Sequence, residues 1–201
     1  MKHTVRVQHV GVADLALPPV EGRARVIGVV PDQIVTEALT EEPPFPDAER
    51  DIAKIAVVER HHGTGRVGLG LVRGFGLRTG AIATTISHDA HNIVVIGADD
   101  DDMARAVTRL AELGGGEVVV EDLGVRAELP LPVAGLLSDA PLEEVLAQSK
   151  ACIDAARRLG CELPAPFQTM SFLALSVIPS LKITDRGLVD VDAFELVSLQ
   201  A

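Results

Sequence analysis

The sequence predicts an α+β fold, built from mixed or antiparallel β-sheets with two main α-helices packed on them, and not a TIM barrel. Three observations favour this class. Short β-type segments dominate residues 4–97, only residues 99–113 and 141–159 have a helical pattern, and the elements follow in the order strands, helix, two strands, helix, strands. The 18 glycines and 12 prolines predict many turns and short elements.

The sequence predicts a small N-terminal β unit, residues 1–45, followed by an α+β domain, residues 46–201. Strand patterns occur in three segments of the first part, 4–10, 24–30 and 34–39. Residues 41–51 contain three prolines and five acidic residues, which is typical of an exposed loop. We therefore place the domain boundary in this loop, near residue 45.

Residues 60–80 are rich in glycine, and we expect no helix there. The segment contains seven glycines, each of which would cost a helix about 1 kcal/mol relative to alanine. The apolar residues between the glycines favour a bent or bulged strand to which another part of the backbone comes close. Two apolar strands are expected next, at 81–86 and 93–97, with a polar loop between them.

The first helix is predicted over residues 99–113. Acidic residues begin it and Gly114 ends it, as expected from the helix dipole and from glycine C-caps. Its apolar residues share one face: Met103, Val107, Leu110 and Leu113. Two strands, 117–121 and 125–129, are predicted after it.

The second helix is predicted from Pro141 to Leu159, with Gly160 after its end. Its inward-facing residues are expected to be Leu142, Val145, Leu146, Ile153 and Ala156. Cys152 and Cys161 lie in or just after this helix, where packing is a simpler role than nucleophilic catalysis. Two such thiols indicate a reducing compartment. From Cys161 to the end, the sequence predicts short apolar segments between prolines.

The composition excludes several classes of function. The 18 Lys and Arg residues against 29 Asp and Glu give a net charge of −11, without a basic run, so nucleic acid and anionic membrane are poor partners. No apolar run approaches the roughly 18 residues of a membrane span, and the N-terminus lacks the apolar core of a signal peptide. We expect a cytoplasmic protein.

One glycine motif resembles a nucleotide-binding fingerprint. Residues 63–68 match GxGxxG, and Asp89 follows at a suitable spacing. A dinucleotide site also needs a helix after the third glycine, because the helix amides bind the pyrophosphate. Further glycines at 70, 74, 76 and 80 argue against that helix, and so against the nucleotide site.

The polar loop between the two apolar strands is the main candidate site. It contains Ser87, His88, Asp89, His91 and Asn92. Histidine titrates near neutral pH, and a neighbouring carboxylate can orient it or raise its pKa. The loop could bind substrate, act as acid and base, or ligate a metal. The alternative is that its side chains only satisfy its own backbone.

The sequence argues against two more specific functions of this loop, a catalytic triad and a metal site. Ser87, His88 and Asp89 are adjacent in sequence and cannot in general form a catalytic triad. A metal site would need a third and a fourth ligand, which the sequence does not clearly supply. His61 and His62 could contribute, but Arg60 beside them is an unfavourable neighbour for a cation.

A set of short sequence blocks resembles one known family. The resemblance runs from about residue 20 to the end and covers, among others, these blocks: Arg25-Val26-Ile27-Gly28, Glu59-Arg60-His61, Gly74-Phe75-Gly76-Leu77, Ser87-His88-Asp89-Ala90-His91-Asn92, Leu113-Gly114-Gly115-Gly116, Glu128-Leu129-Pro130-Leu131-Pro132, Ser171-Phe172-Leu173-Ala174-Leu175 and Thr184-Asp185-Arg186-Gly187. Together they are similar to the C-terminal domain of bacterial and archaeal adenine deaminases.

The resemblance implies a metal-dependent hydrolase of the amidohydrolase superfamily, which converts adenine and water to hypoxanthine and ammonia in purine salvage. In that family a binuclear manganese or iron centre in a barrel activates water. Such a barrel needs roughly 200 residues by itself, and the paired HxH motif of its strand is absent here. We therefore expect no metal held by this chain, no catalytic residue in it, and a barrel domain or subunit as its partner.

Two functions stay open. The chain is either the C-terminal domain of an adenine deaminase, working with a barrel supplied elsewhere, or a stand-alone purine-binding or assembly module without catalysis. In the first case we expect Ser87, His88, Asp89, His91 and Asn92 to shape the purine pocket or the domain interface. A homo-oligomer is also expected, since a surface that faced the barrel would be apolar.

Overall fold

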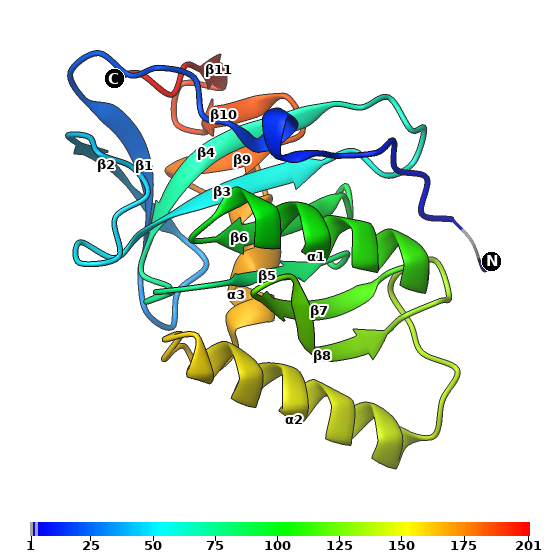
Figure 1. Ribbon diagram of the computed structural model, residues 1–201. Helices are drawn as coiled ribbons and strands as arrows, with labels where there is room; N and C mark the ends of the chain where they lie inside the picture. The colour runs from blue at the N-terminus through cyan, green and yellow to red at the C-terminus, as the bar shows by residue number, and fades with distance from the viewer. Residues whose placement is uncertain (1, 3) are drawn as a thin grey trace.

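The computed structural model describes residue 2 and residues 4–201, and it confirms the predicted α+β class (Figure 1). The strands are β1 (Ala24–Val29), β2 (Thr36–Glu41), β3 (Ile52–Val58), β4 (Val67–Arg73), β5 (Ala81–Thr84), β6 (Ile93–Gly97), β7 (Gly116–Glu121), β8 (Gly124–Pro130), β9 (Leu181–Thr184), β10 (Gly187–Asp190) and β11 (Glu195–Val197). The helices are the 3-10 helix η1 (Val12–Leu15) and the α-helices α1 (Asp100–Leu113), α2 (Leu142–Arg158) and α3 (Pro166–Leu173).

The strands form one large and one small sheet. The eight-stranded sheet has the order β2-β1-β4-β3-β6-β5-β7-β8, and the three-stranded sheet has the order β11-β10-β9. Among the described residues, β1 and β4 are the one parallel pair of named strands, and the other pairs are antiparallel. Within the same part of the chain β2 and β8 do not pair with each other, so the sheet is open and not a barrel.

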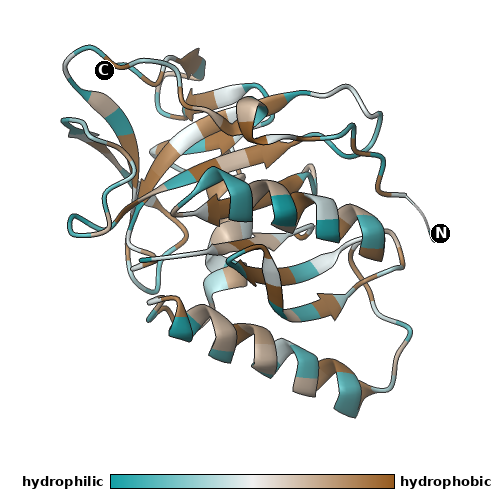
Figure 2. Ribbon diagram, in the orientation of Figure 1, coloured by the Kyte–Doolittle hydropathy of each residue, from teal (hydrophilic) through white to brown (hydrophobic). Residues whose placement is uncertain are grey.

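The large sheet separates two hydrophobic cores. α1 and η1 cover one face, and α2, α3 and the small sheet cover the other (Figure 1). All seven residues of β3 are buried; Ile55 and Val57 face one core, whereas Ala56 and Val58 face the other. Figure 2 shows the hydrophobic residues concentrated on the central strands. A strand with two buried faces gives the loops at its ends a rigid base.

The glycine-rich segment forms β4, where the backbone of the small sheet comes close as predicted. A Cβ atom at Gly68 would lie 1.9 Å from the carbonyl oxygen of Thr184. Real Cβ atoms do not approach an oxygen this closely, so no larger residue fits at this point. The glycine therefore lets β9 and β10 pack directly on β4.

The first predicted helix is confirmed, with its caps. The Asp99 side chain accepts a hydrogen bond from the amide of Asp102 at 2.8 Å, and Gly114 ends the helix with φ of 78°. The predicted apolar face is buried at Met103, Val107 and Leu110. These signals are local, and tertiary packing reinforces them here.

Three expectations about elements are wrong. Residues 4–10 form no strand; Val5 and Val7 pack on the core beside α1, and that packing produces the alternation without a sheet ladder. The segment 166–173, predicted only as an apolar piece, is the helix α3, which starts at a proline as helices often do. Leu142 and Leu146 of α2 do not face inward, since they are 67% and 60% exposed.

α2 contacts the large sheet through its C-terminal half instead. Cys152, Ala155 and Ala156 are buried there, and burial raises the pKa of the Cys152 thiol. The thiol is therefore protonated and serves as a packing group.

β1 joins the large sheet through β4, and the domain boundary near residue 45 stays a prediction. Within the described residues, none of the helices combines the length and apolarity that crossing a membrane would require.

Glu117 of β7 gives this fold a pH dependence. Burial raises its pKa from 4.5 to about 7, because a carboxylate loses hydration on the sheet face that α2 covers. An acid whose pKa rises on folding stabilises the fold fully below pH 4.5 and loses that contribution as the pH rises through 7.

We therefore expect Glu117→Gln to become more stable than the native protein as the pH rises from 4.5 to 8, by up to about 2–3 kcal/mol. Urea denaturation at several pH values measures this difference. The exposed Glu143→Gln variant is the control, and its stability difference should stay flat. A difference between Glu117→Gln and the native protein that does not change with pH would contradict the assignment.

Candidate functional site

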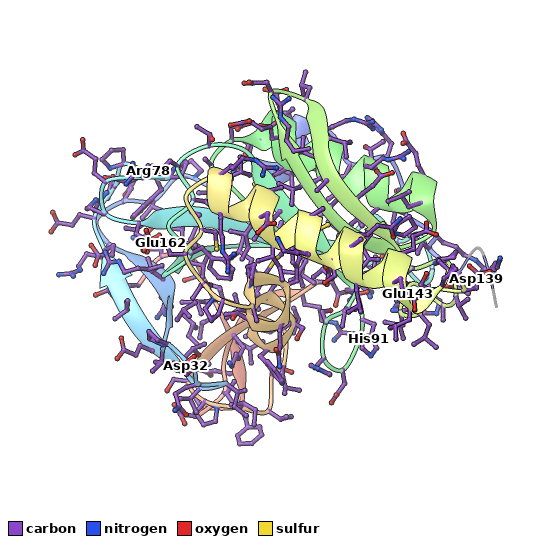
Figure 3. All side chains as sticks on the ribbon, turned by 90° about the horizontal axis from the view of Figure 1, so that it is seen from below. Asp32, Arg78, His91, Asp139, Glu143 and Glu162 are labelled. Atoms are coloured by element: carbon purple, nitrogen blue, oxygen red, sulfur yellow. The ribbon has the colours of Figure 1, made fainter. Side chains whose placement is uncertain are left out.

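The predicted site residues lie on the connection between β5 and β6, named here the Ser87–Asn92 loop. Figure 3 shows His91 on the side of the molecule that carries α2 and α3. Both strands are buried, and they pair with each other antiparallel, from Ala81 opposite Gly97 to Thr84 opposite Val94. The loop thus starts and ends on fixed backbone.

Ser87 and Asn92 hold the loop closed. Both are buried, with exposed fractions of 1% and 4%. The Ser87 hydroxyl donates to the carbonyl of Asn92 at 2.9 Å, and the amide of His91 donates to the carbonyl of Ser87 at 2.6 Å. The amide of His88 donates to the carbonyl of Ser171 in α3 at 3.0 Å. These bonds fix the loop to itself and to α3.

Arg60 joins the loop to the rest of the domain. Its side chain is buried; Nε donates to the carbonyl of His91, and Nη2 donates to the carbonyl of Ala134 at 3.1 Å. Its amide donates to Oδ1 of Asn92 at 3.3 Å. No carboxylate of the described chain forms an ion pair with it. Burial lowers the pKa of the guanidinium, which nevertheless stays charged at neutral pH.

Glu59 organises the neighbouring turn. Its carboxylate is 2% exposed and accepts hydrogen bonds from the amides of His61, His62 and Thr64 at 2.6, 2.8 and 3.0 Å, and from the Thr64 hydroxyl at 2.9 Å. Burial alone would raise its pKa, but these bonds outweigh that effect and lower it to about 2. His61, placed in this way, bonds to the carbonyl of Ala90 at 2.6 Å.

The two loop histidines contact each other. The rings of His88 and His91 are 5.8 Å apart, and His88 stacks on Phe172 of α3 at 4.9 Å. Burial lowers the pKa of His91 from 6.5, the nearby Arg60 guanidinium lowers it further, and the Asp89 carboxylate opposes them, so the neutral ring is favoured at pH 7. Because Nδ1 of His91 accepts from the amide of Ser87, its proton is on Nε2.

A cavity of about 210 Å³ opens beside the loop. Ser87, Asp89 and Asn92 line it from the loop, with Val177 after α3 and Asp185 in the turn after β9. The side-chain amide of Asn92 donates to Asp185 at 3.3 Å. In the described part of the chain, the Asp89 carboxylate has no hydrogen-bond partner. The cavity thus combines an apolar wall with two carboxylates, one of them unengaged.

The structure brings the five predicted residues into one unit, but in two groups. Ser87, Asp89 and Asn92 line the cavity, whereas His88 and His91 do not. His88 lies against Phe172 instead. Their role in binding substrate stays a prediction.

Sequence reasoning gave no role in this site to three residues that complete it: Arg60, Phe172 and Asp185. Arg60 follows a buried strand pattern, and Asp185 lies in a Thr-Asp-Arg-Gly turn. These two sequence patterns indicate where a strand ends and where a turn lies. They do not show that the strand end and the turn lie close together in space.

The described residues do not form a metal site. No group of three or more His, Cys, Asp or Glu side chains in that part of the chain is arranged to hold an ion. The described residues therefore do not supply the ligands of a binuclear centre, which the resemblance assigns to the barrel.

We expect Glu59→Gln to lower the free energy of unfolding at pH 7 by about 2–3 kcal/mol, because hydrogen bonds to a buried charge are lost. An acid whose pKa falls on folding stabilises the fold above pH 4.5 and loses that contribution as the pH falls through 2. The difference between variant and native protein should therefore shrink in acid. Urea denaturation between pH 7 and 3 measures it, and a difference that stays constant over this range would contradict the role of the carboxylate.

Comparison with known proteins assigns the family. Residues 32–195 match the family described as adenine deaminase C-terminal domain. The chain is 52% identical over 200 residues to an adenine deaminase of Archaeoglobus fulgidus, covering 100% of this chain and 35% of that protein. It is 50% identical over 204 residues to one of Oleidesulfovibrio alaskensis, covering 98% and 36%. The chain spans about a third of the length of these relatives. It therefore belongs to the family of adenine deaminase C-terminal domains.

Proposed function

We propose that this chain works as the C-terminal part of an enzyme that hydrolyses adenine to hypoxanthine and ammonia, and that the Ser87–Asn92 loop helps to shape its purine pocket. The relatives named adenine deaminase are about three times as long, and the matched part is their C-terminal domain. The proposal places the metal-dependent chemistry, with manganese or iron, in the remaining part. Purine salvage, a cytoplasmic location and a homo-oligomer belong to the same proposal.

The observation that supports the pocket role most strongly is the exposed Asp89 carboxylate, which lines the cavity and has no hydrogen-bond partner among the described residues. Adenine offers an exocyclic amino group and a ring N–H as donors, and a carboxylate accepts from either. Apolar side chains such as Leu175 and Val177 suit the flat faces of the ring. The loop is held by buried bonds on both sides, so it would present Asp89 without a large cost of ordering.

The first test of the proposal is activity. Adenine loss is followed by ultraviolet absorbance for this chain alone, for the catalytic part of an adenine deaminase alone, and for the two joined. We expect turnover only when the catalytic part is present, and more of it when this chain is joined. Turnover by this chain alone would overturn the proposal, and binding of adenine without any turnover of the joined form would favour a stand-alone binding module.

The second test concerns the pocket. We expect Asp89→Asn in the joined form to raise KM for adenine about tenfold with a small change in kcat, since one acceptor oxygen becomes a donor and the charge is lost without a change of shape. Asp101→Asn, an exposed carboxylate at the start of α1, is the matched control and should leave both constants unchanged. A native KM for Asp89→Asn would remove Asp89 from the pocket.

A further inference from the structure

A second and larger hollow, the α3 groove, lies apart from the cavity beside the Ser87–Asn92 loop. Its volume is about 840 Å³. Its lining comes from the turn between β1 and β2, residues 30–34, from the Gly74–Gly76 bend, and from α3 through Gln168, Thr169 and Phe172. The groove shares no lining residue with the cavity beside the loop.

The walls of the α3 groove are held by partly buried hydrogen bonds. Both oxygens of Asp51 accept backbone amides, from Gly74 at 3.0 Å and from Gly76 at 2.6 Å. The buried Lys182 donates to the carbonyl of Ile34 at 2.7 Å, and burial lowers its pKa to about 8. The buried ammonium group of Lys182 thus holds the β1–β2 turn in place. The groove is therefore preformed.

The charges at the rim of the groove are mostly negative. Asp32, Glu49 and Glu162 are exposed carboxylates from three separate segments, and none of them has an ion-pair partner among the described residues. Arg78 is the one basic residue among those that line the groove. Figure 3 shows Asp32, Glu162 and Arg78 on the same side of the molecule. The rim therefore favours a cationic occupant.

Part of the lining and of the border of the groove is apolar. Phe75 and Phe172 line it, and Ile34 and Val35 of the β1–β2 turn stay 44% and 40% exposed. Val35 is not among the lining residues, so the exposed apolar surface continues past the hollow itself. A polypeptide segment could occupy the hollow and also cover Val35 outside it.

The size of the relatives indicates where such a segment comes from. The chain covers 33–36% of the length of the adenine deaminases it matches, so about two thirds of each relative lies outside this domain. That part contacts this domain if the Ser87–Asn92 loop helps to shape the purine pocket, as proposed above. The α3 groove offers the shape and the charge for one such contact.

We propose that a basic, partly apolar segment of the catalytic part of the polypeptide binds in the α3 groove. The inference rests on the proposed function for the identity of its partner. It also connects the groove to the purine pocket: Phe172 lines the groove and stacks on His88. A segment seated against Phe172 would hold His88, and with it the loop, in the arrangement seen here.

Hydrogen exchange tests this proposal. Amide exchange is compared between this chain alone and the chain joined to the catalytic part of an adenine deaminase. We expect exchange in residues 30–35 and 165–172 to slow at least tenfold in the joined form. The triple variant Asp32→Lys, Glu49→Lys, Glu162→Lys should lose this protection, because its rim repels a basic segment.

The control carries the same charge change elsewhere. Asp101→Lys, Asp122→Lys and Glu143→Lys replace three exposed carboxylates outside the groove, and Figure 3 shows Glu143 away from Asp32 and Glu162. This variant should keep the protection. Equal exchange in the single and joined forms, protection that survives reversal of the rim, or equal losses in both triple variants would overturn the proposal.

Adenine turnover, measured in the same samples, separates the two proposals. Protection of the groove in a joined form that does not deaminate adenine would support the docking site and count against the proposed function. Turnover in a joined form whose groove exchanges as fast as that of the single chain would support the function and overturn the docking site.

Discussion

The site of this domain depends on one buried cation that has no anionic partner in the described part of the chain. Arg60 leaves water and is compensated by carbonyl oxygens alone, those of His91 and Ala134. A buried charge is costly unless it is hydrogen-bonded, so these carbonyls have to stay where they are for the fold to be stable. The requirement fixes the Ser87–Asn92 loop and the turn after β8 relative to β3. The position of the loop therefore depends on the burial of Arg60.

The large sheet makes this arrangement possible. β3 is buried on both faces and paired on both edges, which leaves little freedom for the two residues that follow it. Glu59 then binds the turn on one side, and Arg60 binds the loop on the other. The positive charge of Arg60 also helps to keep His91 neutral. One pair of adjacent residues thus controls both the shape and the charge of the candidate site.

Sequence patterns predicted the parts of this structure that depend on local chemistry. The cap and apolar face of α1, the close backbone approach at the glycines of β4 and the grouping of Ser87 to Asn92 all follow from short-range rules. The helix α3 was missed because it is buried on several sides and has no clear apolar face. Leu142 and Leu146 were placed wrongly, because the helical period does not show where a helix leaves the sheet. The meeting of Arg60, Phe172 and Asp185 depends on the order of strands, which no local pattern encodes.

The role of Arg60 is tested most directly by the exchange of single amides in the Arg60→Met variant, which keeps much of the side-chain volume without the donors. The account predicts that the amides of His88 and His91, which are hydrogen-bonded in the native loop, exchange at least about tenfold faster, since bonds to a charged donor contribute about 1.5–3 kcal/mol. The amides shared by β3 and β6 should keep their protection. Native exchange rates at His88 and His91 in this variant would contradict the account.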